Sequence, residues 1–325
     1  MLAENRKETV AFQVVEAYEI KVMNLLKKEQ ILITGGSGLI GTYLTKELLK
    51  DKKYQITVVD RLKPSIAGIS FVQSNFSNAK IMLPLLKKTD YLFHLAAMVG
   101  VDNCRLKPKE VIKVNYTDTK KLIDLCIEAK IKKIAFASSS EIYGNSKELP
   151  YRENNKPSPI SDYAKCKLKI EKYLRKVQKK SFVKVGIVRF FNVYGPGQKE
   201  MVIPLFAEAA SKNKPLIVLG DGNQTRTFIY VEEAAFGIQK VFNFDSDYEI
   251  FNIGSEEEVK IIDLARIILK NFPNSKSNIV LVPYGGKFRD RGLEIYRRVP
   301  SVDKAKRLLK FEAKYTLEQG IKKLF

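Results

Sequence analysis

Histidine is almost absent from this chain, which has His94 as its one imidazole among 325 residues. Multi-histidine metal centres are therefore excluded, and a catalytic triad built on histidine is largely excluded as well. We predict no metal site. A general base in this protein is expected to be a tyrosine, a lysine or a carboxylate.

Cysteine is scarce too, and its pattern excludes two further classes of protein. Cys104, Cys126 and Cys166 are odd in number, widely spaced and in no C-x-x-C arrangement, so neither a disulfide framework nor a zinc site is indicated. The chain also lacks an apolar run of the ~20 residues that span a bilayer. Its first thirty residues carry charges throughout and lack the apolar core of a signal peptide. These absences predict a cytoplasmic protein without membrane association.

Negative charge is in short supply, with 36 Asp and Glu against 57 Lys and Arg and a formal net charge of +21. Such a balance raises nucleic acids and anionic substrates as partners. The lysines are nevertheless scattered over expected helix faces, and no nucleic-acid-binding motif accompanies them. A lysine-rich solvated surface is the favoured interpretation, and nucleic acid is not a favoured partner. A substrate that carries a diphosphate also fits the charge.

Short apolar runs alternate with helix-period segments from residue 31 onward. Runs that are apolar on both faces and separated by helices are typical of a parallel sheet with right-handed crossovers. The sequence therefore predicts an α/β fold, a Rossmann-type doubly wound parallel sheet with a smaller, interwoven C-terminal substrate-binding lobe. The expected strands lie at 31–34, 54–60, 69–74, 91–97, 133–140 and 183–190.

The alternation breaks after Phe191, and this break sets the expected domain boundaries. We predict a Rossmann domain over 30–190 that is completed by about 225–255. The smaller lobe would consist of 191–224 and 256–325. Residues 1–29 form a separate helical extension in this prediction, because an apolar stripe recurs there at 4-3-4-3 spacing: Ala11, Val15, Tyr18, Val22 and Leu25.

A glycine-rich turn follows the first expected strand. It satisfies two overlapping dinucleotide-binding patterns through Gly35, Gly36, Gly38 and Gly41. Glycines at this spacing let the backbone turn sharply and approach a pyrophosphate, which the start of the next helix then faces. Asp60 ends the following strand, roughly 20 residues on, where an acid binds the ribose hydroxyls of the cofactor. Since Asp60 would repel a 2′-phosphate, NAD is preferred over NADP, although the neighbouring Arg61 weakens that preference.

Tyr163 and Lys167 lie four residues apart at the start of an expected helix that Ser161 or Asp162 would cap. This spacing places both side chains on one helical face. A nearby ammonium favours the phenolate, so we expect Lys167 to lower the pKa of Tyr163 from about 10 towards neutrality. The tyrosine would then take a hydroxyl proton while a nicotinamide takes the hydride.

Together these segments resemble the extended short-chain dehydrogenase/reductase family, and within it the nucleotide-sugar epimerases, dehydratases and decarboxylases. The resemblance runs from about residue 30 to the C-terminus, and the N-terminal 29 residues stand outside it. It is carried in order by "TGGSGLIG", "HLAA", "SSSEIYG", "YAKCK", "RFFNVYGPGQ", "GDGNQTRTFIYVEEAA", "FNIGS" and "RRVPSVDKAKRLL".

The resemblance implies roles for individual residues. Tyr163 would be the catalytic base, Lys167 its partner that also holds the nicotinamide ribose, and Ser139 the group that hydrogen-bonds the reacting sugar hydroxyl. The bound NAD would be lined by Gly35, Gly38, Leu39, Ile40, Gly41, Asp60, Arg61, Leu95, Ala96, Ala97, Tyr163 and Lys167. The nucleotide-diphosphate sugar would contact Ser139, Ser140, Asn192, Arg226 and Arg298, of which Asn192 and Arg226 match residues that hold the diphosphate. A homodimer is expected.

Members of this family oxidise the sugar at C4 and then diverge. In the resemblance, Glu141 is typical of dehydratases and of UDP-glucuronate decarboxylases, where a carboxylate works near C5 and C6. Ser140 replaces the aspartic acid common in dTDP-glucose dehydratases, and Arg298 matches an arginine of the decarboxylases. We therefore expect a 4,6-dehydratase or a UDP-glucuronate decarboxylase-like enzyme. A 4-epimerase is the alternative, and a non-catalytic NAD-binding protein with a basic nucleic-acid-binding surface is the alternative of another class.

Overall fold

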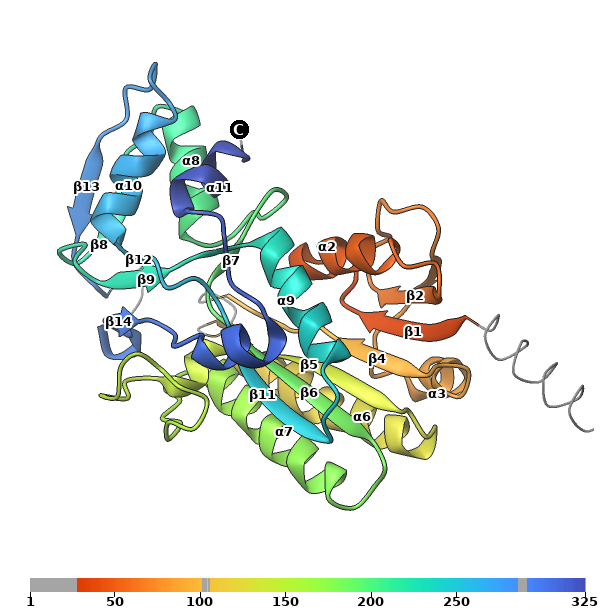
Figure 1. The fold of residues 1–325 in the computed structure, drawn as a ribbon. Helices are drawn as coiled ribbons and strands as arrows, with labels where there is room; N and C mark the ends of the chain where they lie inside the picture. Colours follow the sequence, from red (N-terminus) through yellow and green to blue (C-terminus); the bar gives the residue numbers. More distant parts are fainter. Residues whose placement is uncertain (1–27, 101–103, 105, 286–290, 325) are drawn as a thin grey trace, which may run out of the picture.

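A seven-stranded sheet forms the centre of the molecule in the computed structural model, which describes residues 28–100, 104, 106–285 and 291–324 (Figure 1). Every neighbouring pair of its strands is parallel, in the order β3-β2-β1-β4-β5-β6-β11. The strands are β1 (Glu29–Thr34), β2 (Tyr54–Asp60), β3 (Ser70–Gln73), β4 (Tyr91–His94), β5 (Lys133–Ser139), β6 (Lys184–Phe190) and β11 (Tyr248–Ile253). This order confirms the predicted Rossmann-type doubly wound sheet.

Both faces of the sheet are buried, which explains the continuous apolar runs in the sequence. Ile31 and Ile33 of β1 face one core together with α2 (Leu39–Leu48) and α9 (Val231–Asn243). Leu32, between them, faces a second core on the other side. The alternation follows from the two-residue period of a strand. Helices α3 (Ala79–Leu86), α6 (Thr119–Glu128) and α7 (Asp162–Gln178) cover this second face (Figure 1).

The strand order reverses at β1, which pairs with β2 on one side and with β4 on the other. In open parallel sheets this switch point leaves a crevice beyond the carboxyl ends of the strands, where ligands bind. The ends of β1, β4 and β5 lie at this edge and carry Thr34, His94 and Ser139. The glycine turn, the "HLAA" segment and the serine run therefore emerge side by side.

A smaller group of elements packs beyond the carboxyl edge around a third core (Figure 1). Its helices are α8 (Val202–Ser211), α10 (Ile261–Lys270) and α11 (Leu317–Lys322). Its strands form three small sheets, from β7 (Val193–Tyr194) with β10 (Ile229–Tyr230), β8 (Leu216–Leu219) with β13 (Ile279–Val282), and β9 (Thr225–Thr227) between β12 (Glu258–Lys260) and β14 (Arg297–Arg298). The chain leaves this group to form α9 and β11 and then returns to it.

Short helical segments complete the described chain. They are α5 (Pro108–Ile112), the π-helix η1 (Lys113–Asp118), the 3-10 helices η2 (Ser140–Tyr143) and η3 (Arg291–Leu293), and the π-helix η4 (Ala305–Leu309). Among the described residues, no helix has the length and apolar character that crossing a membrane requires. The predicted helix at the N-terminus lies outside the described residues.

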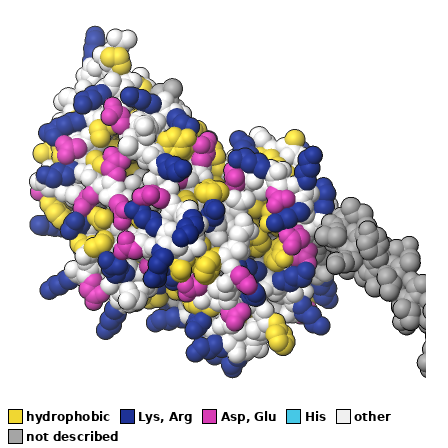
Figure 2. Space-filling model, viewed as in Figure 1, with side chains coloured by type: hydrophobic (Ala, Val, Ile, Leu, Met, Phe, Trp, Pro, Cys, Tyr) yellow, Lys and Arg dark blue, Asp and Glu magenta, His cyan; other side chains and the backbone are white. Residues whose placement is uncertain are grey.

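Positive side chains are distributed over the visible face of the molecule and are interspersed with acidic ones (Figure 2). Lysines on the surface of the described residues form ion pairs with acidic neighbours, such as Lys132 with Asp90 and Lys212 with Glu208. On this face the excess of lysine takes the form of a mixed surface. It does not gather into one basic stripe.

A candidate active site at the carboxyl edge of the sheet

The glycine turn after β1 and the start of α2 leave no room for a side chain at Gly35 or Gly41. Gly35 has a φ of +77°, and a Cβ there would lie 2.5 Å from the backbone nitrogen of Ala96. A Cβ on Gly41 would lie 2.2 Å from the carbonyl oxygen of Gly35. The first contact brings the segment after β4 against the turn, and the second packs α2 onto it. Only glycine satisfies both positions.

Asp60, at the end of β2, reaches this turn. Its carboxylate accepts hydrogen bonds from the backbone nitrogens of Ser37, at 3.0 Å, and of Arg61, at 2.6 Å. Helix α2 begins after Gly38, and no side chain of the described residues caps its first turn. Its N–H groups can therefore bind an anion.

A tight glycine cradle, an open helix N-terminus and an acid beside them suit the pyrophosphate and adenosine ribose of NAD. The residues predicted to line the cofactor lie around this turn. Leu39 and Ile40 open α2, and Leu95, Ala96 and Ala97 follow β4. Tyr163 and Lys167 come from α7, on the side where the nicotinamide would lie. When bound, NAD supplies the hydride acceptor for the chemistry described below.

His94 is buried at the end of β4, next to this site. Its Nδ1 lies 2.6 Å from the Thr34 hydroxyl, and its Nε2 lies 3.1 Å from the Thr119 hydroxyl. Burial, and secondarily the charge of Lys167, lowers the pKa of His94 to about 3. A neutral imidazole therefore joins β1, β4 and α6. The two threonines carry no sequence signal that would have revealed this role.

The residues predicted to be catalytic meet between β5 and α7. Ser139 ends β5, and its hydroxyl accepts a hydrogen bond from the Glu141 backbone nitrogen at 3.2 Å, which caps η2. Tyr163 and Lys167 lie on the first turns of α7, with the Lys167 nitrogen 5.7 Å from the centre of the Tyr163 ring. The Lys167 ammonium donates to the carbonyl oxygen of Ala137 at 2.7 Å.

The expected direction of the Tyr163 pKa shift is wrong for this structure. Burial raises the pKa of Tyr163, the nearby Glu141 carboxylate adds to the rise, and a hydrogen bond with Ser139 opposes it. Burial also lowers the pKa of Lys167 to about 7. The helix spacing indicates that the ammonium lies near the phenol, but it carries no information on the cost of burying both groups.

A charged cluster adjoins Tyr163. The Arg298 Nη1 lies 3.6 Å from Oε1 of Glu141, whose Oε2 accepts a hydrogen bond from the Ser161 hydroxyl at 3.1 Å. The Arg298 Nη2 donates to Oδ1 of Asn192 at 2.8 Å. The side chain of Arg298 is 11% exposed, and no group of the described residues accepts a hydrogen bond from its Nε. The structure therefore brings three predicted residues, Glu141, Asn192 and Arg298, into one cluster.

Two predicted substrate contacts differ from simple expectation. Arg226 on β9 is buried, forms an ion pair with Glu294 and donates to the Thr225 carbonyl oxygen at 2.7 Å. Its charge is therefore already shared with a protein carboxylate. Ser140 is 2% exposed, so η2 turns it inward. The partner Glu294 had no sequence signal, because it lies 68 residues away from Arg226.

The site also includes a thiol that the sequence analysis did not place there. The pKa of Cys104 is raised to about 11, first by burial and then by the charge of Glu141, and a backbone hydrogen bond with Tyr163 opposes the rise. Cys104 therefore lies beside two of the predicted catalytic residues as a neutral thiol. Of the two candidate helix caps, Ser161 and Asp162, Ser161 is the cap, and its hydroxyl accepts from the Ala164 nitrogen at 3.1 Å. Its second bond, to Glu141, was not foreseen.

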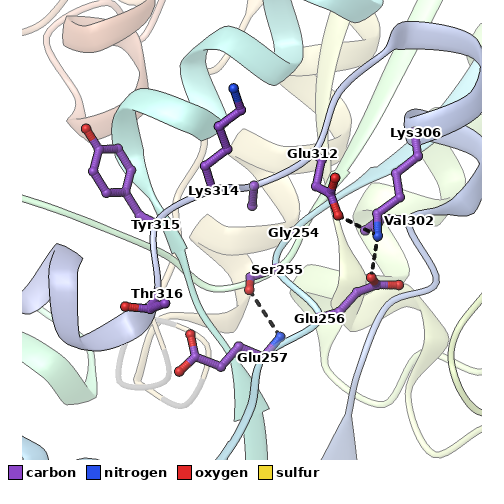
Figure 3. A pocket seen from close by; sticks show the side chains of 11 residues that line it. Gly254, Ser255, Glu256, Glu257, Val302, Lys306, Glu312, Lys314, Tyr315 and Thr316 are labelled. Atoms are coloured by element: carbon purple, nitrogen blue, oxygen red, sulfur yellow. Dashed lines mark hydrogen bonds and ion pairs between the residues drawn. The ribbon is translucent and has the colours of Figure 1, made fainter.

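A separate pocket of about 200 Å³ lies against the C-terminal segment (Figure 3). The ammonium of Lys306 lies between the carboxylates of Glu256 and Glu312, at 2.8 and 2.7 Å. The lining comes from 254–257, 302, 306 and 312–316, outside the predicted catalytic residues. Three of its charged side chains thus pair with one another, and we assign the pocket no chemistry.

Comparison with known proteins agrees with the geometry. Residues 31–254 match the model of the NAD dependent epimerase/dehydratase family. The chain is 35% identical over 313 residues to a UDP-N-acetyl-alpha-D-glucosaminuronate decarboxylase of Bacillus cytotoxicus, covering 91% of this chain and 96% of that protein.

Solved structures give the same result. An epimerase from Methanothermobacter thermautotrophicus superposes with a TM-score of 0.84 at 27% identity, covering 92% of this chain and 91% of that one. A UDP-glucuronic acid 4-epimerase from Bacillus cereus, solved with UDP-glucuronic acid and NAD, gives a TM-score of 0.82 at 25% identity, covering 91% and 98%.

The chain belongs to the NAD dependent epimerase/dehydratase family. The family and these relatives confirm the predicted NAD cofactor and the predicted class, an NAD-dependent enzyme that modifies nucleotide sugars. They leave the individual catalytic residues as proposals.

Proposed function

We propose that this protein decarboxylates a nucleotide-diphosphate hexuronate at C6. The observation that carries the proposal is the cluster of Arg298, Glu141 and Asn192 beside Tyr163. A largely buried guanidinium whose Nε finds no acceptor among the described residues can donate a charge-assisted hydrogen bond to a carboxylate. The B. cytotoxicus relative, which is named as a decarboxylase of a UDP-linked uronate, supports this choice.

The residue at 140 argues against dehydration. A dehydratase must protonate the leaving C6 hydroxyl, and Ser140 offers no carboxylic acid for that purpose. It is also buried, so it cannot reach a ligand in the present conformation of η2. Glu141 is the neighbouring carboxylate that could protonate the leaving hydroxyl. It already accepts a hydrogen bond from Ser161 and pairs with Arg298.

The proposed chemistry assigns one role to each residue. Tyr163 would take the proton of the C4 hydroxyl as the hydride leaves C4 for the bound NAD, and the Ser139 hydroxyl, hydrogen-bonded to Tyr163, would orient the sugar. The new C4 ketone makes the substrate a β-keto acid. The C5–C6 bond then breaks, its electron pair forms the C4 enolate, CO₂ leaves, and a proton from solvent is added at C5. Arg298 holds the carboxylate until this step. Return of the hydride to C4 and of the proton from Tyr163 would restore the C4 hydroxyl, so that the only net loss is CO₂.

Phenolate formation at Tyr163 requires help that the cluster alone does not give, because burial raises its pKa. A protonated Lys167 would supply it by favouring the negative charge. Since the pKa of Lys167 is lowered to about 7, the protonated fraction of Lys167 decreases as the pH rises through neutrality. We therefore expect activity to fall above neutral pH.

The test is a panel of UDP-, dTDP-, GDP- and CDP-linked hexoses and hexuronates, incubated with the enzyme and NAD and analysed by mass spectrometry. The proposal predicts loss of CO₂ from a hexuronate. Loss of water from a hexose would instead establish a dehydratase, and an unchanged mass with altered NMR couplings would establish an epimerase. Either result in place of decarboxylation overturns the proposal.

Two arginines that are adjacent in the sequence provide the matched variants. Arg298→Ala is expected to lower kcat/KM for the hexuronate by about 100-fold, because it removes hydrogen bonds to a charged group. Arg297→Ala is the control, since Arg297 is exposed and pairs with Glu258 on the surface at 2.8 Å. Tyr163→Phe should lose activity by ~10²- to 10⁴-fold while it still binds NAD. Equal activity of the Arg298 and Arg297 variants would contradict the assignment.

A further inference from the structure

Tyr143 is a fully buried tyrosine that the proposed chemistry does not use. It closes η2 two residues after Glu141. Its hydroxyl donates to Oδ1 of Asn252 at 2.7 Å and accepts from Nη1 of Arg189 at 2.9 Å. Burial raises its pKa to about 12, so the group remains a hydroxyl that both donates and accepts. Two chains of hydrogen bonds start from this one atom.

The first chain leads to the catalytic helix. Arg189 on β6 donates to both oxygens of Glu171, at 3.1 and 2.7 Å. Glu171 lies one helical turn after Lys167 on α7 and accepts from the Ser138 hydroxyl at 2.5 Å. Ser138 precedes Ser139. The ion pair therefore fixes the end of β5 against the turn of α7 that carries the lysine.

The second chain leads to Arg298. The Asn252 amide donates to the carbonyl oxygens of Tyr151, at 2.8 Å, and of Ser301, at 3.3 Å. Tyr151 in turn pairs with the segment that follows Arg298, since its nitrogen donates to the Val299 carbonyl at 2.8 Å and its carbonyl accepts from the Ser301 nitrogen at 2.8 Å. The backbone next to Arg298 is thus tied by hydrogen bonds to an asparagine near the end of β11.

The side chains in both series of hydrogen bonds are almost wholly buried. The exposed fraction is 0% for Asn252, 2% for Glu171 and 3% for Arg189. Burying so many polar groups is costly unless each is satisfied, and a satisfied network holds one arrangement of its surroundings. This network joins the two elements that carry the Arg298–Glu141 contact of 3.6 Å. Glu141 lies on η2 together with Tyr143. Arg298 immediately precedes the segment that pairs with Tyr151.

We infer that Tyr143 and Asn252 are positioning residues that set Arg298 against Glu141 for binding of the substrate carboxylate. The inference rests on the proposed function, because that function supplies the substrate carboxylate that Arg298 beside Glu141 would bind. Neither residue would touch the substrate. Their effect would pass through Arg298.

Tyr143→Phe is the main test variant. It keeps the ring, which stacks on Tyr151 with centroids 4.8 Å apart, and removes only the hydroxyl. We expect KM and Kd for the nucleotide hexuronate to rise about tenfold, the equivalent of about one buried hydrogen bond. Binding of NAD and of the matching nucleotide hexose, which lacks the carboxylate, should stay within about twofold. A role in stability alone would lower Tm and leave the ratio of the two affinities unchanged.

A double-mutant cycle shows whether Tyr143 acts through the arginine. In the Arg298→Ala background, Tyr143→Phe should cause no further loss of hexuronate affinity, since the group that it positions is gone. Tyr91→Phe is the control, because it also removes a hydrogen-bonded phenol, here bonded to Glu29 at 3.1 Å at the opposite edge of the sheet. Losses from Tyr143→Phe and Arg298→Ala that simply add would overturn the inference.

The two proposals fail in different ways. If the wild-type enzyme does not release CO₂ from any hexuronate, the proposed function fails. Calorimetric binding of hexuronate and hexose ligands to wild type and Tyr143→Phe still tests the positioning role, because it needs no turnover. Equal loss of affinity for both ligands, or no loss for either, contradicts that role whatever the reaction.

Discussion

The imidazole of His94 is enclosed by hydroxyl groups of Thr34 and Thr119, and this placement determines its charge. A buried cation without a carboxylate beside it would cost several kcal/mol, so the ring stays neutral. At the scale of single residues the same logic applies to Lys167, whose pKa is lowered to about 7 by burial. In both cases the surroundings set the protonation state.

A pH titration of His94 is simple because it is the one histidine of the chain. Its pKa of about 3 lies below the unfolded value of ~6.5, so the unfolded state binds the proton more readily between these values. The free energy of unfolding should therefore decrease as pH falls below ~6.5, by a few kcal/mol in total near pH 3.

Histidine NMR should show a single imidazole signal that does not titrate between pH 5 and 8. Urea unfolding of wild type and His94→Gln across this range separates the histidine from the carboxylates, because the variant lacks this one titration. A signal that titrates near pH 6.5 would show that the ring is not enclosed.

Two elements that meet at the glycine turn decide whether the cofactor can bind. Helix α2 approaches the turn at Gly41, and the segment after β4 approaches it at Gly35. A third element, η1, fixes that segment from the other side, because the Asn115 amide donates to the Met98 carbonyl at 2.8 Å and accepts from its nitrogen at 3.0 Å. The site is thus assembled by close backbone approaches at the two glycines and by the Asn115 side chain.

Gly41→Ala is expected to destabilise the protein by about 2 kcal/mol and to weaken NAD binding strongly. The added methyl group would lie 2.2 Å from the Gly35 carbonyl oxygen, so α2 must move away from the turn. Thermal unfolding with and without NAD measures both effects, since a protein that binds NAD gains in Tm. Lys46→Ala on the exposed side of α2 should behave as wild type. An NAD-induced rise in Tm equal to that of wild type would contradict the packing argument.

Elements with a strong sequence period could be predicted, while contacts between distant residues could not. The strands of the sheet, the glycine turn and α7 follow from apolar runs and local motifs. Helix α6 is preceded by the π-helical turn η1, for which the sequence carries no local pattern. The bonds of Glu294 to Arg226 and of Tyr143 to Asn252 join residues 68 and 109 positions apart, so only the fold reveals them. The shift of the Tyr163 pKa was missed because spacing alone carries no information on burial.

At the scale of the whole molecule, one buried ion pair links most of the site. Glu171 and Arg189 connect α7 with β6, while their hydrogen bonds reach β5 and the segment near Glu153. Surface pairs such as Lys306 with Glu256 lie in water and are expected to contribute much less to the free energy of unfolding.

The expected homodimer and the expected domain boundaries stay predictions. Light scattering with size-exclusion chromatography tests whether the protein is a homodimer.

Glu171→Gln should lower the free energy of unfolding by about 3 kcal/mol, because it leaves the buried Arg189 charge without its carboxylate. Lys306→Gln, which breaks two exposed pairs, should cost less than ~1 kcal/mol. Guanidinium unfolding of the three proteins measures the difference. Similar costs for the two variants would mean that the buried pair is solvated in solution.

The position of β11 in the sheet has a consequence for how the chain folds. Strand β6 ends at Phe190, but its outer neighbour β11 begins only at Tyr248, so a long connection must close before the two can pair. During synthesis, β6 would leave the ribosome before β11, so the strand residues that later pair with β11, such as Arg189 with Asn252, would form an open edge. The unpaired N–H and C=O groups of such an edge strand can form hydrogen bonds with strands of other protein molecules. The slowest and most aggregation-prone stage of folding is therefore expected to end when β11 docks.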